Sequence, residues 1–518
     1  MKKFLNVLGK LLLVAIIVLI ISIYSNLKDR NRHYRADIKI ISNEELPLHA
    51  GFAAVKITPD VPDRWTDADN DATYSPKKGD TFSDLNGNGK FDPVWIAGFH
   101  NSRAANGVHD DLWARTFVID DSKTRLAIVV LDAIGFMNNE VIDVRKKLGP
   151  ETGINYLIIT STHSHEAPDL LGLWGKTNFR SGVDKKYVEF VKQQILESVK
   201  NAVMNLRQVR FEVAEDPDGA AHLIADTRLP YVFDSGLRII RAVDIETGKT
   251  NGTLVSWGNH PETLWSKNLM ISSDFPHYVR EFVENGIYRN DSLKVTGTGG
   301  ICLYVNGAIG GLMTTNPDIT VRDPVTGNEF SNPSFEKAEA EGKQIAMLVL
   351  KAMQKPSVTI EKAGISIISK SVILPVHNRL FRLAAALGIL DRGTTGWMKM
   401  RSEIAVFNIG PLSFVGLPGE VYPEIVNGGI EAPEGQDYNI KPVELPPVRQ
   451  MMPGQIRFVF GLANDEIGYI IPKSQWDVKE PFAYGKNKPQ YGETNSLGPE
   501  TAPLIHSAVK EMIQELNN

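Results

Sequence analysis

Residues 154–168, INYLIITSTHSHEAP, begin as an apolar, β-branched run and end in hydroxyl side chains and two histidines. An apolar run of this length predicts a buried strand. Side chains two residues apart on an extended chain point to the same face, so His163 and His165 can reach one centre. The pair therefore predicts a metal site, although a single imidazole at a strand end is more often a hydrogen-bonded structural residue.

The composition of the 518-residue chain is that of an ordinary globular protein, with 42% hydrophobic and 23% charged residues. The formal net charge of -5 carries no basic excess, which argues against nucleic acid as a partner. The single cysteine, Cys302, excludes an intrachain disulfide and a cysteine-rich metal site. Because Cys302 lies in the apolar run 301–305, we expect a buried, inert thiol.

Residues 1–35 differ from the rest of the chain in composition. Two lysines precede an apolar segment, LLLVAIIVLIISIY at 11–24, and several basic residues follow it. Counted from Phe4, the segment reaches the ~20 residues that span a bilayer. No small-x-small cleavage pattern follows, so we expect a retained membrane anchor in preference to a cleaved signal peptide. The catalytic domain is expected outside the cytoplasm, either anchored or, after cleavage, secreted or periplasmic.

The hydrophobic pattern predicts an α/β fold of the mixed α+β kind, with mixed sheets flanked by helices. After a spacer at 36–50, we expect one large domain over 51–518, which contains an acidic insertion at 60–95. Strands are predicted by apolar runs or alternation at 51–59, 116–120, 126–132, 154–160, 208–257, 357–375 and 404–417. Helices are predicted by 3- and 4-residue apolar spacing at 140–148, 184–206, 274–285, 334–353 and 501–516.

The acidic insertion contains a candidate calcium loop, DLNGNGKFD at 84–92. Its oxygen-bearing side chains at loop positions 1, 3, 5 and 9 are those of Asp84, Asn86, Asn88 and Asp92. A bidentate acid is expected at position 12, but Trp95 stands there. The alternatives are a structural Ca²⁺ site and an acidic surface loop with Asn-Gly turns.

Two further apolar runs end in potential metal ligands, one at His260 and one, after a hairpin, at Glu420. A catalytic zinc ion typically takes three protein ligands of the His and Glu type and keeps one position for water. The pKa of that water falls toward ~7, which supplies a nucleophile at neutral pH. Spacing alone does not rank the remaining candidates, which are His100, His109, His277, Asp132, Asp274 and Arg228.

Several segments resemble, in order and spacing, the catalytic domain of the neutral (non-lysosomal) ceramidases. They are Gly107-Val108-His109, Thr162-His163-Ser164-His165, His260-Pro261, Pro418-Gly419-Glu420 and the stretch from Asn464 to Tyr469. The likeness covers residues 50–518 as spaced motifs. It implies a zinc-dependent hydrolase that cleaves an amide bond in an N-acyl substrate, such as a sphingolipid.

The resemblance also implies roles for individual residues. The zinc ligands it implies are His163, His260, Glu420 and Tyr469. His165 matches a histidine that stabilises the tetrahedral intermediate, while Arg228 and Tyr491 match active-site residues. Without the resemblance, Glu420 is better explained as a capping carboxylate and Tyr469 as a half-buried core ring.

The chain departs from the family at the loop where ceramidases carry Gly-Asp-x-Ser-Pro. The matching residues 307–311, GAIGG, contain no hydroxyl, which excludes a serine nucleophile there and leaves water as the attacking group. Substrate contacts made by the family's aspartate and serine are also lost. The family's carboxyl-terminal immunoglobulin-like domain is expected to be missing.

Two other functions remain open from the sequence. One is a non-catalytic surface-binding protein that keeps the ceramidase-like fold. The other is an unrelated metallohydrolase with a His-x-His site, such as a binuclear phosphoesterase. The second lacks an obvious motif for its additional ligands, because Glu166-Ala167-Pro168 follows the histidine pair.

Overall fold

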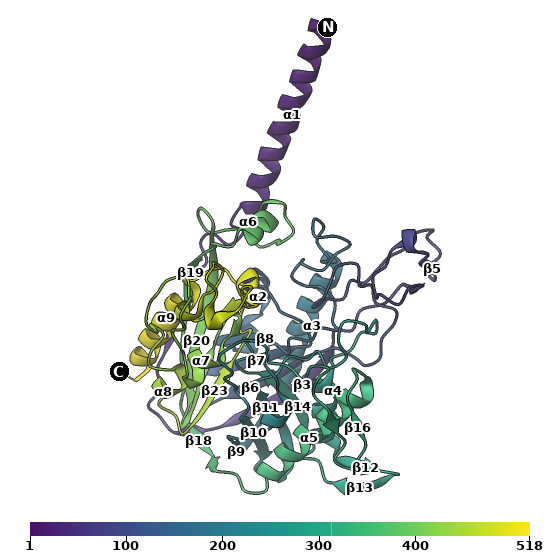
Figure 1. The fold of residues 1–518 in the computed structure, drawn as a ribbon. Coiled ribbons are helices and arrows are strands. Elements are labelled where there is room, and N and C mark those ends of the chain that lie inside the picture. Colours follow the sequence, from purple (N-terminus) through teal and green to yellow (C-terminus); the bar gives the residue numbers. More distant parts are fainter. Residues whose placement is uncertain (312, 518) are drawn as a thin grey trace.

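The computed structural model describes residues 1–311 and 313–517, and two large β-sheets dominate it (Figure 1). Within the described residues, one sheet has nine strands in the order β14-β11-β10-β9-β3-β6-β7-β8, with β17 paired to β9. Its strands are β3 (His49–Lys56), β6 (Trp113–Asp120), β7 (Arg125–Leu131), β8 (Tyr156–Ser161), β9 (Arg207–Asp216), β10 (Leu237–Asp244), β11 (Thr250–Trp257), β14 (Ile301–Asn306) and β17 (Val358–Ile360).

The second sheet is five-stranded among these residues, in the order β1-β19-β20-β21-β23. The strands are β1 (Asp37–Ile40), β19 (Ile365–Pro375), β20 (Lys399–Ile409), β21 (Leu412–Gly416) and β23 (Ile456–Phe460). It packs face to face on the first sheet, because Phe117 and Phe211 share one buried cluster with Phe407, Phe414 and Phe458. Period-2 alternation gives each sheet a second apolar face for helices to cover.

Helices cover both outer faces, so the layers follow the order helix, sheet, sheet, helix (Figure 1). Helices α2 (Asn138–Lys147) and α3 (Lys185–Met204) pack on β6, β7 and β8. Helices α4 (Phe275–Asn285) and α5 (Phe335–Ala352) pack on β10, β11 and β14. Helix α9 (Thr501–Asn517) covers the five-stranded sheet. The predicted mixed α/β class is confirmed.

Shorter elements connect these layers. The acidic segment contains the hairpin of β4 (Asp63–Thr66) and β5 (Thr81–Asp84). Helix α6 (Arg379–Ala386) and helices α7 (Pro423–Asn427) and α8 (Val448–Met451) were not predicted from the sequence pattern. Three further strand pairs are β2 (Leu46–Pro47) with β18 (Lys362–Ala363), β12 (Ile287–Arg289) with β13 (Ser292–Val295), and β15 (Val321–Arg322) with β16 (Glu329–Phe330).

The amino-terminal helix α1 (Lys2–Leu27) projects away from the sheets (Figure 1). Within residues 1–311 and 313–517, one helix is long and apolar enough to cross a membrane, and it is this one, over Lys3–Leu27. None of its apolar window is buried against the rest of the chain. By length and composition it fits an anchor or a signal sequence. The predicted boundaries at residues 35, 50 and 95 stay predictions.

Three of the candidate ligands each follow a strand that belongs to a parallel pair. Strand β7 is parallel to β8, β11 to β14, and β21 to β23. Parallel strands have their carboxyl ends at the same edge of a sheet, which is where α/β proteins usually bind ligands. His163 follows β8, His260 follows β11, and Glu420 follows β21 in the short strand β22 (Glu420–Val421). Strand β22 pairs in parallel with β24 (Tyr469–Ile470), which sets Glu420 beside Tyr469.

The loop after β14 packs directly against β22, and Gly310 makes this approach possible. Its backbone N–H donates to the Val421 carbonyl at 2.9 Å. A Cβ atom at residue 310 would lie 2.1 Å from Cδ1 of Tyr422 and 2.7 Å from the backbone nitrogen of Tyr422. A side chain here therefore forces the loop away from β22.

Substitution of Gly310 by alanine is expected to lower the free energy of unfolding by about 1–3 kcal/mol, the usual cost of overpacking a closed site. The measurement is thermal or denaturant unfolding of the detergent-solubilised full chain. Gly310→Ser should be no more stable than Gly310→Ala. Wild-type stability in both variants would show that the loop does not pack as described.

Candidate metal centre

A backbone turn brings His163 and His165 to one centre. His163 has a φ of +68°, in the left-handed region, so the extended geometry predicted for this pair is wrong. A non-glycine residue there costs of order 1–3 kcal/mol and persists only where its surroundings hold it. The N–H of His163 donates to Ala133 at 2.9 Å, and the N–H of His165 donates to Pro261 at 3.0 Å. The two rings still meet, through this turn and not through strand alternation.

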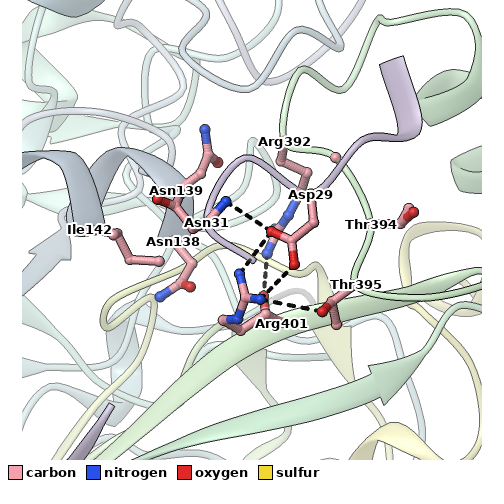
Figure 2. Close-up of a pocket in the computed structure, with 10 residues that line it drawn as sticks. Asp29, Asn31, Asn138, Asn139, Ile142, Arg392, Thr394, Thr395 and Arg401 are labelled. Atoms are coloured by element: carbon pink, nitrogen blue, oxygen red, sulfur yellow. Dashed lines mark hydrogen bonds and ion pairs between the residues drawn. The ribbon is translucent and has the colours of Figure 1, made fainter. Parts of the chain in front are cut away.

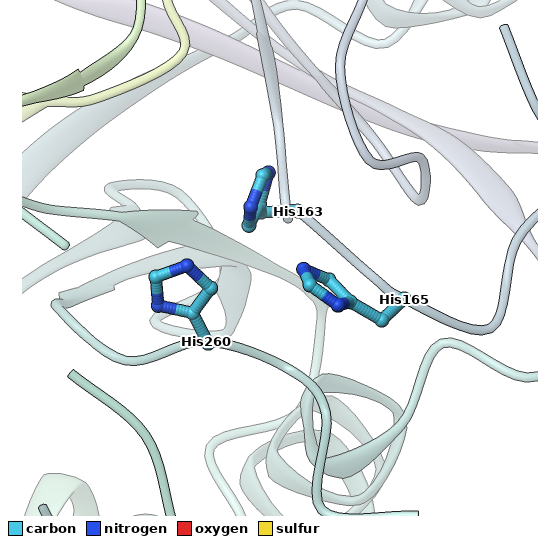
Figure 3. Close-up of side chains that lie close together, drawn as sticks. All are labelled: His163, His165 and His260. Atoms are coloured by element: carbon cyan, nitrogen blue, oxygen red, sulfur yellow. The ribbon is translucent and has the colours of Figure 1, made fainter. Parts of the chain in front are cut away.

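The rings of His163, His165 and His260 surround a common space (Figure 3). Each offers one ligand atom, and the three atoms lie within 4.8 Å of one another. Nδ1 of His163 lies 2.6 Å from the Ile134 carbonyl. Nδ1 of His260 lies 2.9 Å from the Met313 carbonyl. Because a carbonyl oxygen only accepts, these two Nδ1 atoms carry the protons, and each Nε2 is free to bind a cation.

A buried carboxylate faces both Nε2 atoms. Oε2 of Glu420 lies 3.0 Å from Nε2 of His260 and 3.6 Å from Nε2 of His163. Burial lowers the pKa of His163 to about 4, so this imidazole is neutral at pH 7. Burial disfavours charge on His260, but its hydrogen bond to Glu420 and the nearby charges of Glu262 and Glu420 together outweigh burial and raise its pKa. The arrangement calls for a positive charge beside the carboxylate.

A divalent cation fits this position better than a proton. A proton satisfies one nitrogen–oxygen pair, whereas a cation can bind both Nε2 atoms and Oε2 together. Two neutral imidazoles and one carboxylate form a ligand set typical of catalytic zinc. The backbone carbonyls of Ile134 and Met313 orient the rings in the way that outer-shell partners orient metal-binding histidines. The residues therefore fit a zinc ion.

His165 differs from the other two histidines. Its Nδ1 lies 3.2 Å from Oε2 of Glu262, but among the described residues neither ring nitrogen has a hydrogen-bond partner of good geometry. The ring packs on Gly98, where a Cβ atom would come within 2.6 Å of it, and lies 5.2 Å from the Phe99 ring. Its position leaves a nitrogen available to a metal or to a substrate.

Two tyrosines complete the polar end of the site. Tyr469 lies beside Glu420 through the β22–β24 pairing, and its ring centroid is 5.8 Å from that of Tyr491. Burial raises the pKa of Tyr469 well above its usual value and that of Tyr491 to about 12. Both phenols therefore keep their protons at neutral pH in the absence of a metal and can donate hydrogen bonds.

Arg228 is buried behind Tyr491. Its guanidinium forms a bidentate ion pair with Glu493, at 2.8 and 2.9 Å, and donates to the Tyr491 carbonyl at 2.7 Å. The ring of Tyr422 lies 5.1 Å from the guanidinium carbon. The structure thus places Arg228 against the segment that carries Tyr491, and its guanidinium is already occupied by these partners.

The site lies at one end of a cavity of about 570 Å³. Its polar lining includes His163, His165, Glu420, Tyr469 and Tyr491. The rest of the wall is largely apolar and includes Phe99, Met137, Leu171, Trp174, Phe381 and Leu390. A cavity of this size and lining suits a small or chain-like apolar ligand whose polar group reaches the histidines.

Sequence reasoning missed three residues that support the site. The side-chain amide of Asn306 donates to Thr162 and Asn259 at 2.9 Å each, which ties the two histidine segments together. Glu262 faces His165, and Glu466 lies in the cavity wall. The available signal was position in the sequence, because Asn306 directly follows the apolar run 301–305 and Glu262 follows His260 by two residues.

The other sequence candidates lie in different surroundings. In the candidate calcium loop, Oδ1 of Asp84 accepts from the N–H of Gly87 at 2.7 Å, and the Asn86 amide donates to Asp92 at 3.0 Å. Asn88 also bonds to Asp92, so the four predicted side chains are near one another and calcium stays a prediction. Asp132 pairs with Arg280 at 2.6 Å and is occupied.

Comparisons with known proteins bear on the fold. No protein-family model matches the chain. Two solved structures are similar to it, one described as a crystal structure of neutral ceramidase from Pseudomonas aeruginosa and the other as ceramidase complexed with C2. Each aligns with a TM-score of 0.63 and 15% sequence identity, over 91% of this chain and 75% of the ceramidase chain. The chain therefore has a ceramidase-like fold, consistent with the resemblance inferred from the motifs.

Alanine substitution of each site histidine distinguishes the two possible ligand sets. In the metal-loaded protein, His163→Ala and His260→Ala should reduce zinc from about one equivalent per chain to below about a tenth, because each removes a ligand. His165→Ala should keep most of the zinc. Metal content is measured by mass spectrometry after dialysis, with the exposed His222→Ala as a control. Equal zinc loss in His165→Ala would show a three-histidine site instead.

Proposed function

We propose that this protein is a zinc-dependent hydrolase that cleaves the amide bond of an N-acyl lipid, with sphingolipids as the expected class. One observation carries the proposal: two imidazoles with fixed Nδ1 protons direct Nε2 at a buried carboxylate, at the end of an apolar cavity. The ceramidase-like fold supports it. Amide hydrolysis as the reaction type is inferred from the resemblance of the sequence motifs to those of neutral ceramidases.

His163, His260 and Glu420 are proposed to hold the zinc ion, with Tyr469 at its edge. When bound, zinc would polarise the amide carbonyl and supply a water nucleophile at neutral pH. The Ile134 and Met313 carbonyls keep both imidazoles in the tautomer that binds through Nε2.

His165 and Tyr469 are proposed to stabilise the negative charge that develops on the carbonyl oxygen. Both side chains line the cavity at its polar end, where preorganised donors act in a partly dry environment. Burial raises the pKa of Glu262, which favours its neutral carboxyl. Oε2 of Glu262 lies 3.2 Å from Nδ1 of His165, so the other ring nitrogen is the one proposed to face the substrate.

The proposed nucleophile is water because no serine is available in residues 307–311. The close approach of Gly310 to Tyr422 gives a physical reason for glycine at this position. Arg228 and Tyr491 are proposed to act as a unit, in which Arg228 positions the backbone of Tyr491 at the cavity wall. The membrane anchor, with the catalytic part outside the cytoplasm, is part of the same proposal.

Hydrolysis should be detectable with purified full-length protein and N-acyl lipids in mixed micelles. Released fatty acid should require zinc, be abolished by a chelator and return on zinc addition. His165→Ala should lower kcat by about 100- to 1,000-fold, the usual loss for one oxyanion donor, while the protein stays zinc-loaded. His222→Ala is the matched control away from the site.

A panel of N-acyl lipids of several head groups and chain lengths, with matched esters, identifies the substrate. Folded, zinc-loaded protein that releases no acid from any of them would contradict the proposal and favour a binding protein with a ceramidase-like fold. Two metal ions per chain together with phosphoesterase activity would favour the unrelated metallohydrolase.

A further inference from the structure

Helix α6 forms the outer rim of the cavity and exposes leucines. Leu380, Leu383 and Leu387 are 63%, 49% and 43% exposed, yet all three also line the cavity. Phe179, which is 71% exposed, lines it too. These four side chains, the rim, therefore connect the apolar interior with the protein surface. A soluble surface rarely shows such a group without a partner.

The anchor helix ends on α6 (Figure 1). The side-chain amide of Asn26 donates to the Ala386 carbonyl, the last residue of α6, at 2.9 Å. The Leu27 carbonyl accepts from the N–H and hydroxyl of Thr394, at 3.0 and 2.9 Å. Arg30 pairs with Asp391. The chain thus passes from the anchor into the fold without a free linker.

A second set of contacts fixes the anchor exit to the five-stranded sheet. Asp29 accepts from both terminal nitrogens of Arg401, at 3.1 and 2.6 Å, as Figure 2 shows. Arg392 donates to the Arg401 carbonyl at 2.9 Å and holds Asp465 in a bidentate pair at 2.8 and 2.6 Å. Asp465 precedes Glu466, which lies in the cavity wall. A continuous polar path therefore joins the anchor exit to the cavity.

These contacts between the end of α1 and the fold fix the position of the rim relative to a membrane that α1 would span. An α-helix of 26 residues is about 39 Å long, enough for the hydrocarbon core of a bilayer. Lys28 and Arg30 follow α1 directly and mark the level of the head groups. Because α1 ends on α6, the rim lies at that same level. Exposed Arg379 and Arg180 adjoin rim residues in sequence, exposed Lys176 precedes Phe179 by three residues, and these positive charges favour anionic head groups.

We propose that the rim docks on the bilayer that carries the anchor, so that the cavity opens directly into lipid. The inference rests on the proposed function for the nature of the substrate. An N-acyl lipid would then slide from the membrane into the cavity without crossing water. The brace between Asp29 and Arg401 keeps the opening pointed at the membrane.

Depth-dependent fluorescence quenching tests the docking. Cysteine replaces Leu383, or Leu293 as a matched control that is 46% exposed in β13, at the opposite end of the molecule from α1 (Figure 1). The natural Cys302 is fully buried and does not compete for a fluorescent label. Full-length protein is placed in phosphatidylcholine–phosphatidylserine vesicles that contain spin-labelled lipid. We expect the label at residue 383 to be quenched by more than half and the label at 293 to be unaffected.

The same assay tests the brace. Asp29→Asn should lower the quenching at residue 383 in the Leu383→Cys background and leave the label at residue 293 unquenched in the Leu293→Cys background. An unquenched label at 383 in the wild-type background, as expected if a second copy of the chain covers the rim, overturns the docking. Quenching that Asp29→Asn leaves unchanged overturns the bracing. Neither quenching measurement depends on hydrolysis. A protein that releases no fatty acid would overturn the proposed function, whereas the docking is decided by the quenching alone.

Discussion

The carboxylate of Glu420 faces Nε2 of both His163 and His260, and this contact joins the ends of the two sheets. The histidines follow strands of the nine-stranded sheet, while Glu420 follows a strand of the five-stranded one. Burying a carboxylate is costly unless positive charge balances it. The proposed zinc ion would supply that charge at the point where two sheets with a shared apolar core place their polar ends together. Glu420 lines the cavity that also reaches the leucines of α6, and helix α1 ends against α6.

Much of the fold was predictable because buried strands and amphipathic helices have strong periodicity. Residues 154–160, 126–132 and 184–206 were each assigned from their apolar spacing, and β8, β7 and α3 lie there. His163 and His260 were recognised as candidate ligands for a related reason, since each follows an apolar run. Their convergence required the fold itself, because a series of antiparallel pairs separates β8 from β11 in the sheet. Glu420 and Tyr469 needed the ceramidase resemblance, since neither stands in a pattern that favours a ligand by itself.

Features set by distant backbone contacts were not predictable from the sequence. The positive φ of His163 depends on packing around Ala133, and the tautomers of His163 and His260 depend on the carbonyls of Ile134 and Met313. Helix α6 is only eight residues long, and its leucines face a cavity on one side and the surface on the other. No local pattern distinguishes that arrangement from an ordinary exposed helix. The link between α1 and α6 joins residues about 360 apart.

The central claim is that one zinc ion lies between His163, His260 and Glu420. X-ray absorption at the zinc edge of the full-length, zinc-loaded protein tests it most directly, because imidazole rings give a distinctive scattering pattern. We expect two imidazole nitrogens and additional oxygen donors at about 2.0–2.1 Å. A spectrum that requires three imidazoles would contradict the assignment of His165 to the substrate. A folded protein that binds no zinc would contradict the metal centre altogether.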